Sequence, residues 1–503
     1  MNCRGFSQLE LLFSSFKRFT NLNKFLLLII FLFVLVATSL YLEFMPDDTF
    51  IHIGYAKNIY EGKGYCFAGN KTYGSTSPLW PPCIAVLTVL HIDLEHAARL
   101  LSFLFSVASI CLMYHVTHLR FSVPISLGAS CLLCFNAYFL RWSLTGMEAT
   151  AACFFMLVLI YLLFKEKRGT IDRFFYLIIG LSPLIRPEFY LFVSFLFMFL
   201  FFTEPTQKYA AKLFIAFIPS VIWNCFAFVY FGTIVPTTFS IKAGNTFFST
   251  EWDTLVRSAK LFLSGNLIEF CVIFLAFVLL LLHSKQTSRK MASHIIRSEF
   301  VLIMLWIVSF YSYYILKNVT ILSRYSLVVL PLIILLMIAL FTRACEQYRL
   351  SQRTTNLLLA ALVATSLLVH GLFTYCIVKP DADSFTHGFQ REYKHIASIL
   401  FAEGCTNGSV ALSDVGIIGV YSGLKIYDFV GLVDKDRFHF SSNRDYFINK
   451  KPRYLISRGE ISLEELKDTS VSFQEIYTTQ IAGLGINQRG NIIVRVHKVF
   501  WRQ

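Results

Sequence analysis

Long apolar runs alternate with short polar segments along most of this chain. The first run, "FLLLIIFLFVLVATSLYLEF", begins at Phe25 and is about as long as the hydrocarbon core of a bilayer is thick. Similar runs recur up to about residue 377 and predict a polytopic α-helical membrane protein. No small-residue cleavage site follows the first run, so we interpret it as an uncleaved span rather than a removed signal peptide.

The basic loops indicate which apolar runs cross the membrane. With a cytoplasmic N-terminus, a crossing by every run would put "KEKRG" (165–169) and "SKQTSRKMASHIIR" (284–297) outside, against the positive-inside rule. The run at 79–92 is short and begins "PLWPP", so we place it on the outer surface. About eleven spans remain, near 24–43, 97–117, 123–140, 148–164, 170–184, 188–203, 211–231, 264–283, 299–316, 324–342 and 355–377.

This topology divides the chain into two predicted domains. Residues 1–377 form the transmembrane domain, which includes a long first outer loop at 44–96. From 378 the composition becomes mixed, and "GSVALSDVGIIGVYSGLKIYDFVGLVD" is typical of short strands separated by glycine turns. Residues 378–503 are therefore predicted to be a soluble extracytoplasmic α/β domain.

Polar clusters are predicted to gather on the outer side. The adjacent Asp47 and Asp48 directly follow the first span, and four more clusters lie at 141–148, 185–189, 230–244 and 323–326. Each cluster alone fits an interface anchor. Five on one side are typical of a membrane active site or transport pathway.

Composition excludes other classes of protein. The chain has 503 residues, is 56% hydrophobic and only 15% charged, and its mean hydropathy is +0.60, which a soluble protein would not have. The net charge of +14 comes from Lys and Arg in short loops without interleaved aromatics, so nucleic acid is not an expected partner. Most cysteines lie inside apolar runs, and Cys131 and Cys134 have no second pair, so no metal site is predicted.

Several motifs follow one another in a recognisable order. They are "DDTFIHIGYAKNIYEGKGYCF", "YGSTSPLW", "LTGMEAT", "LIRPEF", "FGTIVPTTFSIKAG", "SRYSLVVLPL" and "SDVGIIGVYSGLKIYDFVGLVD". This series resembles the GT-C fold polyprenyl-phosphate-dependent glycosyltransferases. It is most similar to the bacterial branch that is terminal arabinofuranosyltransferase-like or protein-mannosyltransferase-like. That family also places a proline-led surface helix in the first outer loop.

The chain departs from the family at two positions. Thr237 stands where the branch usually has Asn, and Phe189 stands where it usually has Gly. These differences concern the choice of substrate rather than the type of reaction.

The resemblance implies a cavity for an inverting sugar transfer. The first acidic residue acts as the general base in the family, which corresponds to Asp47, and Asp48 would then orient the acceptor or a neighbouring cation. The reaction needs cations for the donor phosphate, and the candidates are Arg141, Arg186, Lys242 and Arg324. Glu148 and Glu188 could bind sugar hydroxyls, hold arginines or ligate a divalent cation. No other cofactor is expected.

The expected activity is therefore a glycosyltransferase in the cytoplasmic (inner) membrane. Its partners would be a polyprenyl-phosphate sugar donor, membrane lipids, and an envelope glycan, lipid or protein acceptor. A transporter or flippase of lipid-linked sugars is the main alternative, but no repeated halves are visible in the sequence. A non-enzymatic assembly protein would leave the aspartate pair unexplained.

Overall fold

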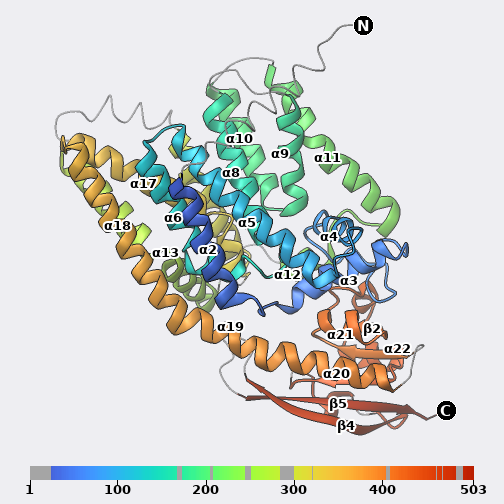
Figure 1. Cartoon of the computed structure of the whole chain (residues 1–503). Coiled ribbons are helices and arrows are strands. Elements are labelled where there is room, and N and C mark those ends of the chain that lie inside the picture. The colour runs from blue at the N-terminus through green and yellow to red at the C-terminus, as the bar shows by residue number, and fades with distance from the viewer. Residues whose placement is uncertain are drawn as a thin grey trace.

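The structure is a computed structural model in which most of the chain is described. The described residues are 24–166, 173–203, 208–243, 251–283, 299–319, 321–403, 408–459, 461–466, 468–482 and 491–502. Figure 1 shows a helical bundle with a smaller sheet-containing domain at one end.

Eleven apolar helices form the bundle within the described residues, as the sequence predicts. Seven are long enough to cross a bilayer by themselves and four are shorter. The long ones are α2 (Lys24–Tyr41), α5 (Leu94–His118), α11 (Lys208–Phe231), α13 (Trp252–His283), α15 (Glu299–Leu316), α17 (Leu330–Gln347) and a composite helix that begins with α18 (Gln352–Phe373). The shorter ones are α6 (Val123–Cys134), α8 (Ala149–Glu166), α9 (Arg173–Ile185) and α10 (Phe189–Thr203).

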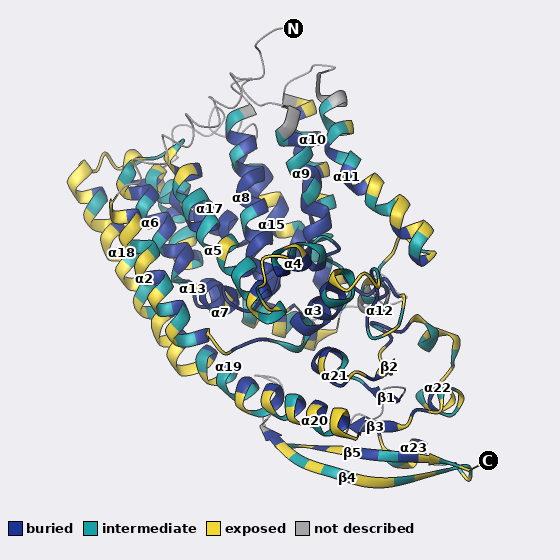
Figure 2. Cartoon of the chain, turned by 45° about the vertical axis from the view of Figure 1, so that its right-hand side comes forward, coloured by how far each residue is buried: buried dark blue, intermediate teal, exposed yellow. Residues whose placement is uncertain are grey.

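The outer surface of the bundle is apolar. Figure 2 shows exposed residues along α11 and α18, whereas α8 is mostly buried. Large exposed side chains include Phe31 on α2, Phe214 and Val229 on α11, Phe274 on α13 and Leu368 on α18. Apolar side chains that face outward on so many helices are expected where a bundle is surrounded by lipid.

The run at 79–92 does not form a spanning helix. It folds as α4 (Trp80–Thr88), which has nine residues and prolines in its first turn. A helix of that length is about 14 Å long, less than half of a hydrocarbon core. The next span starts afresh at α5, where the Asp93 side chain accepts hydrogen bonds from the amides of Glu95 and His96.

One continuous helix of 51 residues joins the bundle to the C-terminal domain. It consists of α18, a π-helical turn (Thr374–Val378), α19 (Lys379–Phe385), a second π-helical turn (Thr386–Gln390) and α20 (Arg391–Ala402). The predicted domain boundary at 378 lies inside this helix, so the two domains are connected by a rigid element.

The C-terminal region is α/β, as predicted. Its sheet has the order β2-β1-β3-β5-β4, in which β1 is parallel to both β2 and β3, and β5 is antiparallel to β3 and β4. The strands are β1 (Ser409–Leu412), β2 (Lys425–Asp428), β3 (Tyr454–Ser457), β4 (Val471–Ala482) and β5 (Asn491–Trp501). Helices α21 (Gly416–Tyr421), α22 (Asn443–Lys450) and α23 (Leu463–Leu466) accompany them.

The two faces of this sheet belong to different cores. Val410 and Leu412 of β1 are buried in the main core together with Ile396 of α20. Ala411, between them, is buried in a second core with Tyr446 and Phe447 of α22. This alternation is expected because successive strand residues point to opposite faces.

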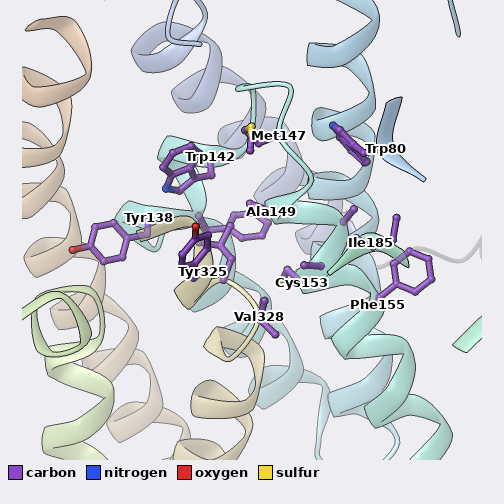
Figure 3. Close-up of a cluster of buried hydrophobic side chains, with 14 of the residues drawn as sticks. Trp80, Tyr138, Trp142, Met147, Ala149, Cys153, Phe155, Ile185, Tyr325 and Val328 are labelled. Carbon is purple, nitrogen blue, oxygen red and sulfur yellow. The ribbon is translucent and has the colours of Figure 1, made fainter. Parts of the chain in front are cut away.

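The main core continues without a break from the bundle into the C-terminal domain. Figure 3 shows a part of it around α8, including Met147, Ala149, Cys153 and Tyr325. Trp80 of α4 also belongs to this core, and its indole N–H donates to the carbonyl of Gly146 at 2.7 Å. The loop before α8 is thereby fixed in place next to α4.

Candidate active site

Helix α3 (Asp47–Tyr60) places the two adjacent aspartates. It begins directly after Pro46, whose extended backbone leads into the helix, and both carboxylates lie in its first turn. Negative side chains are favourable there because of the unpaired amides and the helix dipole. Successive helical residues point about 100° apart, so the two carboxylates reach different surroundings.

Asp48 lines a cavity of about 620 Å³ formed by helix α3, helices of the bundle and the segments that connect them. Its carboxylate accepts a hydrogen bond of 2.6 Å from the Arg324 guanidinium. Arg324 lies on the short helix α16 (Ser323–Ser326), which directly precedes α17. The polar lining includes Asp48, His52, Ser75, Thr76, Glu148, Arg186, Glu188, Thr238, Tyr314, Arg324 and Tyr325.

Arg186 is held by two glutamates in this cavity. Its guanidinium donates to Glu148 at 2.9 Å and to both carboxylate oxygens of Glu188 at 2.5 and 3.2 Å. The second oxygen of Glu148 lies 3.3 Å from the His52 ring. Of the three roles considered for Glu148 and Glu188, the structure shows the binding of an arginine.

Two tyrosines complete the charged cluster, and neither was singled out from the sequence. Tyr325 lies between the arginines, with Arg186 at 4.4 Å and Arg324 at 5.2 Å from its ring centroid. Tyr314 stacks on Tyr325, and its hydroxyl donates to Glu188. The motif "SRYS" contains Tyr325, so the tyrosine next to the candidate arginine was the available signal.

Arg324 is less fully neutralised than Arg186. Its ion pair with Asp48 is to a carboxylate whose side chain is 42% exposed, whereas Arg186 is bound to two buried carboxylates. The Arg324 Nε is buried and has no hydrogen-bond partner in the described part of the chain. Arg324 is therefore the cavity arginine whose counter-ion an anionic ligand can most readily replace.

Apolar side chains also line the cavity, and some of them are exposed on the surface of the bundle. Trp306 and Phe310 of α15 line its depth. At its border, Ile234 is 53% exposed and Leu322 is 41% exposed, and both also line the cavity. Exposed apolar side chains in the lining of a cavity on a lipid-surrounded bundle are suited to contact with a hydrocarbon chain.

Asp47 does not line this cavity among the described residues. Its carboxylate accepts hydrogen bonds of 2.9 Å from the amides of Gly416 and Ile417 in the C-terminal domain. Burial beneath this domain and the nearby Asp414 carboxylate raise the pKa of Asp47 to about 7. The structure therefore assigns the two adjacent aspartates to different surroundings.

Arg141, another predicted cation, does not line the cavity. Arg141 of α7 (Ala137–Trp142) forms an ion pair of 2.6 Å with Asp381 of α19 and packs on the Phe44 ring. It thus connects the bundle to the long composite helix. Lys242 is in α12 (Thr237–Ala243), but its side chain lies outside the described residues.

The C-terminal domain contributes one wall of the cavity through Leu432. The carbonyl of Leu432 accepts a hydrogen bond of 2.7 Å from Thr237, the residue at the first departure from the family pattern. Asp428 shapes this loop by accepting from the amides of Val430 and Val433 at 2.8 and 3.0 Å. Burial raises the pKa of Asp428 to about 6.

Phe189, at the second departure, is fully buried in the main core. It begins α10 directly after Glu188. Among the described residues, no group of three or more His, Cys, Asp or Glu side chains is placed to hold a metal ion.

Sequence comparisons identify only the C-terminal part of the chain. Residues 386–491 match the family described as Domain of unknown function (DUF8728). A search of curated proteins found no match.

Solved structures with a similar fold cover almost the whole chain. ArnT from Cupriavidus metallidurans bound to undecaprenyl phosphate is 11% identical, with a TM-score of 0.64 over 93% of this chain and 97% of that one. An oligosaccharyltransferase from Archaeoglobus fulgidus is 11% identical, with a TM-score of 0.52 over 87% of this chain and 69% of that one. The archaeal enzyme AglB from the same organism, in complex with an inhibitory peptide and a dolichol-phosphate, has a TM-score of 0.50 and is also 11% identical. At these identities the likeness establishes the fold, and the chain has the GT-C fold that its sequence predicts.

Proposed function

We propose that this protein is a membrane glycosyltransferase that moves a sugar from a polyprenyl-phosphate donor to an acceptor of the cell envelope. The acceptor would be a glycan, lipid or protein on the outer side of the cytoplasmic membrane. The observation that carries this proposal is one cavity lined by a carboxylate, by the arginine that pairs with it, and by exposed apolar side chains.

The cavity fits a ligand with an anionic head and a long apolar tail. Arg324, whose partner carboxylate is partly exposed, would exchange that partner for the phosphate and hold the phosphate by charge-assisted hydrogen bonds. The tail would leave past Ile234 and Leu322 into the bilayer. ArnT was solved with undecaprenyl phosphate and AglB with a dolichol-phosphate, which supports this class of donor.

Asp48 is the better placed of the two aspartates to act as the general base. It lines the cavity, whereas the carboxylate of Asp47 is bound to backbone amides of another domain. Asp48 would accept the proton of an acceptor hydroxyl as that oxygen forms a bond to the anomeric carbon. The bond from that carbon to the phosphate oxygen breaks on the opposite side, so the configuration is inverted and the phosphate leaves as an anion.

The ion pair between Asp48 and Arg324 can couple donor binding to base activation. A donor phosphate competes with the Asp48 carboxylate for the same guanidinium, which is 2.6 Å away in the structure without ligands. Loss of a neighbouring positive charge makes a carboxylate a stronger base. The base would therefore become most reactive when the donor is in place.

The arabinofuranosyltransferase-like or protein-mannosyltransferase-like branch remains our proposal for the donor. These branches differ in whether a pentose or a hexose is transferred. Mass spectrometry of envelope glycans from cells with and without the protein tests this, because a missing pentose or hexose names the sugar and its acceptor together.

Transfer and transport can be separated in detergent, where no second compartment exists. Purified protein would be incubated with lipid extract containing polyprenyl-phosphate sugars and with envelope acceptors, with and without a divalent cation. A covalent glycosylated product supports the transferase. If the protein is folded and still binds undecaprenyl phosphate but forms no glycosylated product, the flippase alternative is favoured.

The proposed orientation puts the C-terminal domain outside. Helix α8 starts next to Glu148 in the cavity and carries Lys165 in its last turn, so this basic end lies away from the cavity. A phosphatase fused after Gln503 should be active, since this reporter folds only outside the cytoplasm. An inactive fusion in cells with normal amounts of the protein would contradict the orientation.

A further inference from the structure

Glycines allow helix α21 to pack closely against helix α3 and against the ring of Phe67. A Cβ atom at Gly416 would overlap the backbone oxygen of Asp47, and a Cβ at Gly419 would overlap the ring of Phe67. The same ring also lies against Gly54 of α3, where a Cβ would overlap it as well. The glycines of "SDVGIIG" thus allow the C-terminal domain to approach α3 at backbone distance.

Asp47 provides the polar part of this contact. Both of its carboxylate oxygens are used, one for the amide of Gly416 and the other for the amide of Ile417. Behind these amides, Asp414 is bound by Arg458 and by the hydroxyl of Tyr393. The Asp47 carboxylate therefore lies on the side of α3 that faces the C-terminal domain and not on the side that lines the cavity.

Further contacts hold the same two surfaces together. Lys57 of α3 donates to the carbonyl of Val420 at 3.3 Å, and Asn70 donates to the carbonyl of Ile426 at 2.9 Å. From α21 the chain continues through β2 to Leu432, which reaches the cavity. There the carbonyl of Leu432 approaches Gly74 so closely that a Cβ on that glycine would lie only 2.5 Å away.

We propose that Asp47 is a positioning residue that docks the C-terminal domain onto α3 and thereby places Leu432 in the cavity wall and Asp48 toward the acceptor. The role in transfer rests on the proposed function, whereas the docking itself does not. Leu432 lines the cavity beside Gly74, whose carbonyl accepts a hydrogen bond from Thr238, and Asp48 lines the same cavity. In this proposal the docked domain forms the part of the cavity wall that the acceptor meets.

Hydrogen exchange of the full-length protein in detergent tests the docking without any substrate. In Asp47→Ala, the amides of Gly416 and Ile417 lose their acceptors, so exchange in peptides covering 415–422 and 429–434 should become roughly tenfold faster or more. Gly416→Ala should do the same with both aspartates retained. Asp48→Asn is the matched control and should leave exchange in these peptides unchanged. Exchange in strand β3 should stay at the wild-type rate in all three variants.

Transfer kinetics then test the positioning role. Asp47→Asn keeps the size and one acceptor atom, so it should retain more than about a tenth of the wild-type kcat while raising the KM for the acceptor. A loss of a hundredfold or more in kcat with wild-type exchange at 415–422 would overturn the proposal and make Asp47 the base. Wild-type exchange in Asp47→Ala would also overturn it. If the wild type transfers no sugar, the proposed function fails while the exchange data still decide the docking.

Discussion

The two sides of helix α3 carry the same kind of residue in opposite circumstances. On the cavity side, Asp48 is partly exposed and pairs with the side chain of Arg324. In the proposed reaction this arginine also binds the ligand. On the domain side, the Asp47 carboxylate is bound to two backbone amides and faces the C-terminal domain. A carboxylate bound to a side chain can exchange partners, whereas one bound to backbone amides can do so only if two domains separate.

The first turn of α3 thus connects the cavity, through Asp48, to the C-terminal domain, through Asp47. Because Asp47 and Asp48 are adjacent, any movement of the C-terminal domain that pulls on Asp47 also turns Asp48. The same reasoning applies to Leu432, which is in the docked domain but lines the cavity. Substitutions on the two sides should still affect turnover and domain docking to different extents, because Asp48 and Asp47 have different partners.

The largest effect is expected from Asp48→Asn on the cavity side. This change keeps the size of the side chain but removes the proposed proton acceptor, so turnover should fall by about a hundred- to ten-thousandfold. Steady-state transfer at saturating donor measures it. The Tm should fall as well, because the buried Arg324 guanidinium loses its partner carboxylate. An Asp48→Asn variant with full turnover would place the base elsewhere.

The two cavity arginines should respond differently to truncation. Arg324→Ala should reduce the efficiency of donor use by roughly ten- to a hundredfold, through loss of a charge-assisted hydrogen bond to phosphate. Arg186→Ala should instead destabilise the protein, since it leaves Glu148 and Glu188 buried without their cation, which typically costs about 3–5 kcal/mol. Binding of undecaprenyl phosphate and the Tm of both variants distinguish these outcomes, and equal Tm losses would contradict the distinction.

On the domain side, Gly419→Ala should lower stability with little effect on the chemical step. The added methyl group would overlap the Phe67 ring between α21 and α3, and overpacking of this kind typically costs about 1–3 kcal/mol. Differential scanning measurements of Tm report the loss. Gly423→Ala is not a suitable control because Gly423 has a positive φ, whereas Gly371→Ala is suitable, since no atom lies near its added Cβ.

The smallest effect is a pH dependence of docking. The raised pKa means that Asp47 binds a proton more tightly in the docked state than in water, so its contribution is complete below about pH 4 and is lost as pH rises through about 7. Asp414, Arg458, Tyr393 and Asp48 are the titratable or charged groups that face it. The Tm should fall by a few degrees between pH 5 and pH 8, and Asp47→Asn should remove this slope; an equal slope in that variant would assign the titration to another group.

Much of the fold could be predicted from the pattern of apolar residues, because each span is a local property of about twenty positions. The basic loops also located the one run, now α4, that is too short to cross. The α/β character of the C-terminal region followed from its short strands and glycine turns. The strand order and the continuous helix through 378 depend on contacts between distant residues, and no local pattern contains them.

The site was predicted as a set of residues but not as a geometry. Glu148, Arg186, Glu188, Arg324 and Asp48 do lie in one cavity. Spacing alone indicated that Asp47 and Asp48 have different directions, but packing against α16 and α21 decides which one meets the cavity. The pairing of Arg141 with Asp381 joins residues far apart in the sequence, so its absence from the cavity could not be foreseen.

A buried polar group inside the bundle was also missed. Glu269 of α13 accepts from Ser366 at 3.1 Å and lies 3.4 Å from the His370 ring on α18. Each of these residues is a single polar position in an apolar run, and only their meeting across two helices makes them notable. They lie outside the lining of the cavity and next to the non-helical Asn266 in α13.

The 51-residue helix from Gln352 to Ala402 makes the protein sensitive to the thickness of the membrane. At 1.5 Å per residue it is roughly 75 Å long, more than twice the thickness of a hydrocarbon core. Its far end carries the domain that supplies Leu432, so the tilt of this helix acts on the same contacts with α3 that hold Leu432 at the cavity. A thicker or thinner bilayer would change the tilt of this helix, and the change in tilt would reach Leu432 at the cavity.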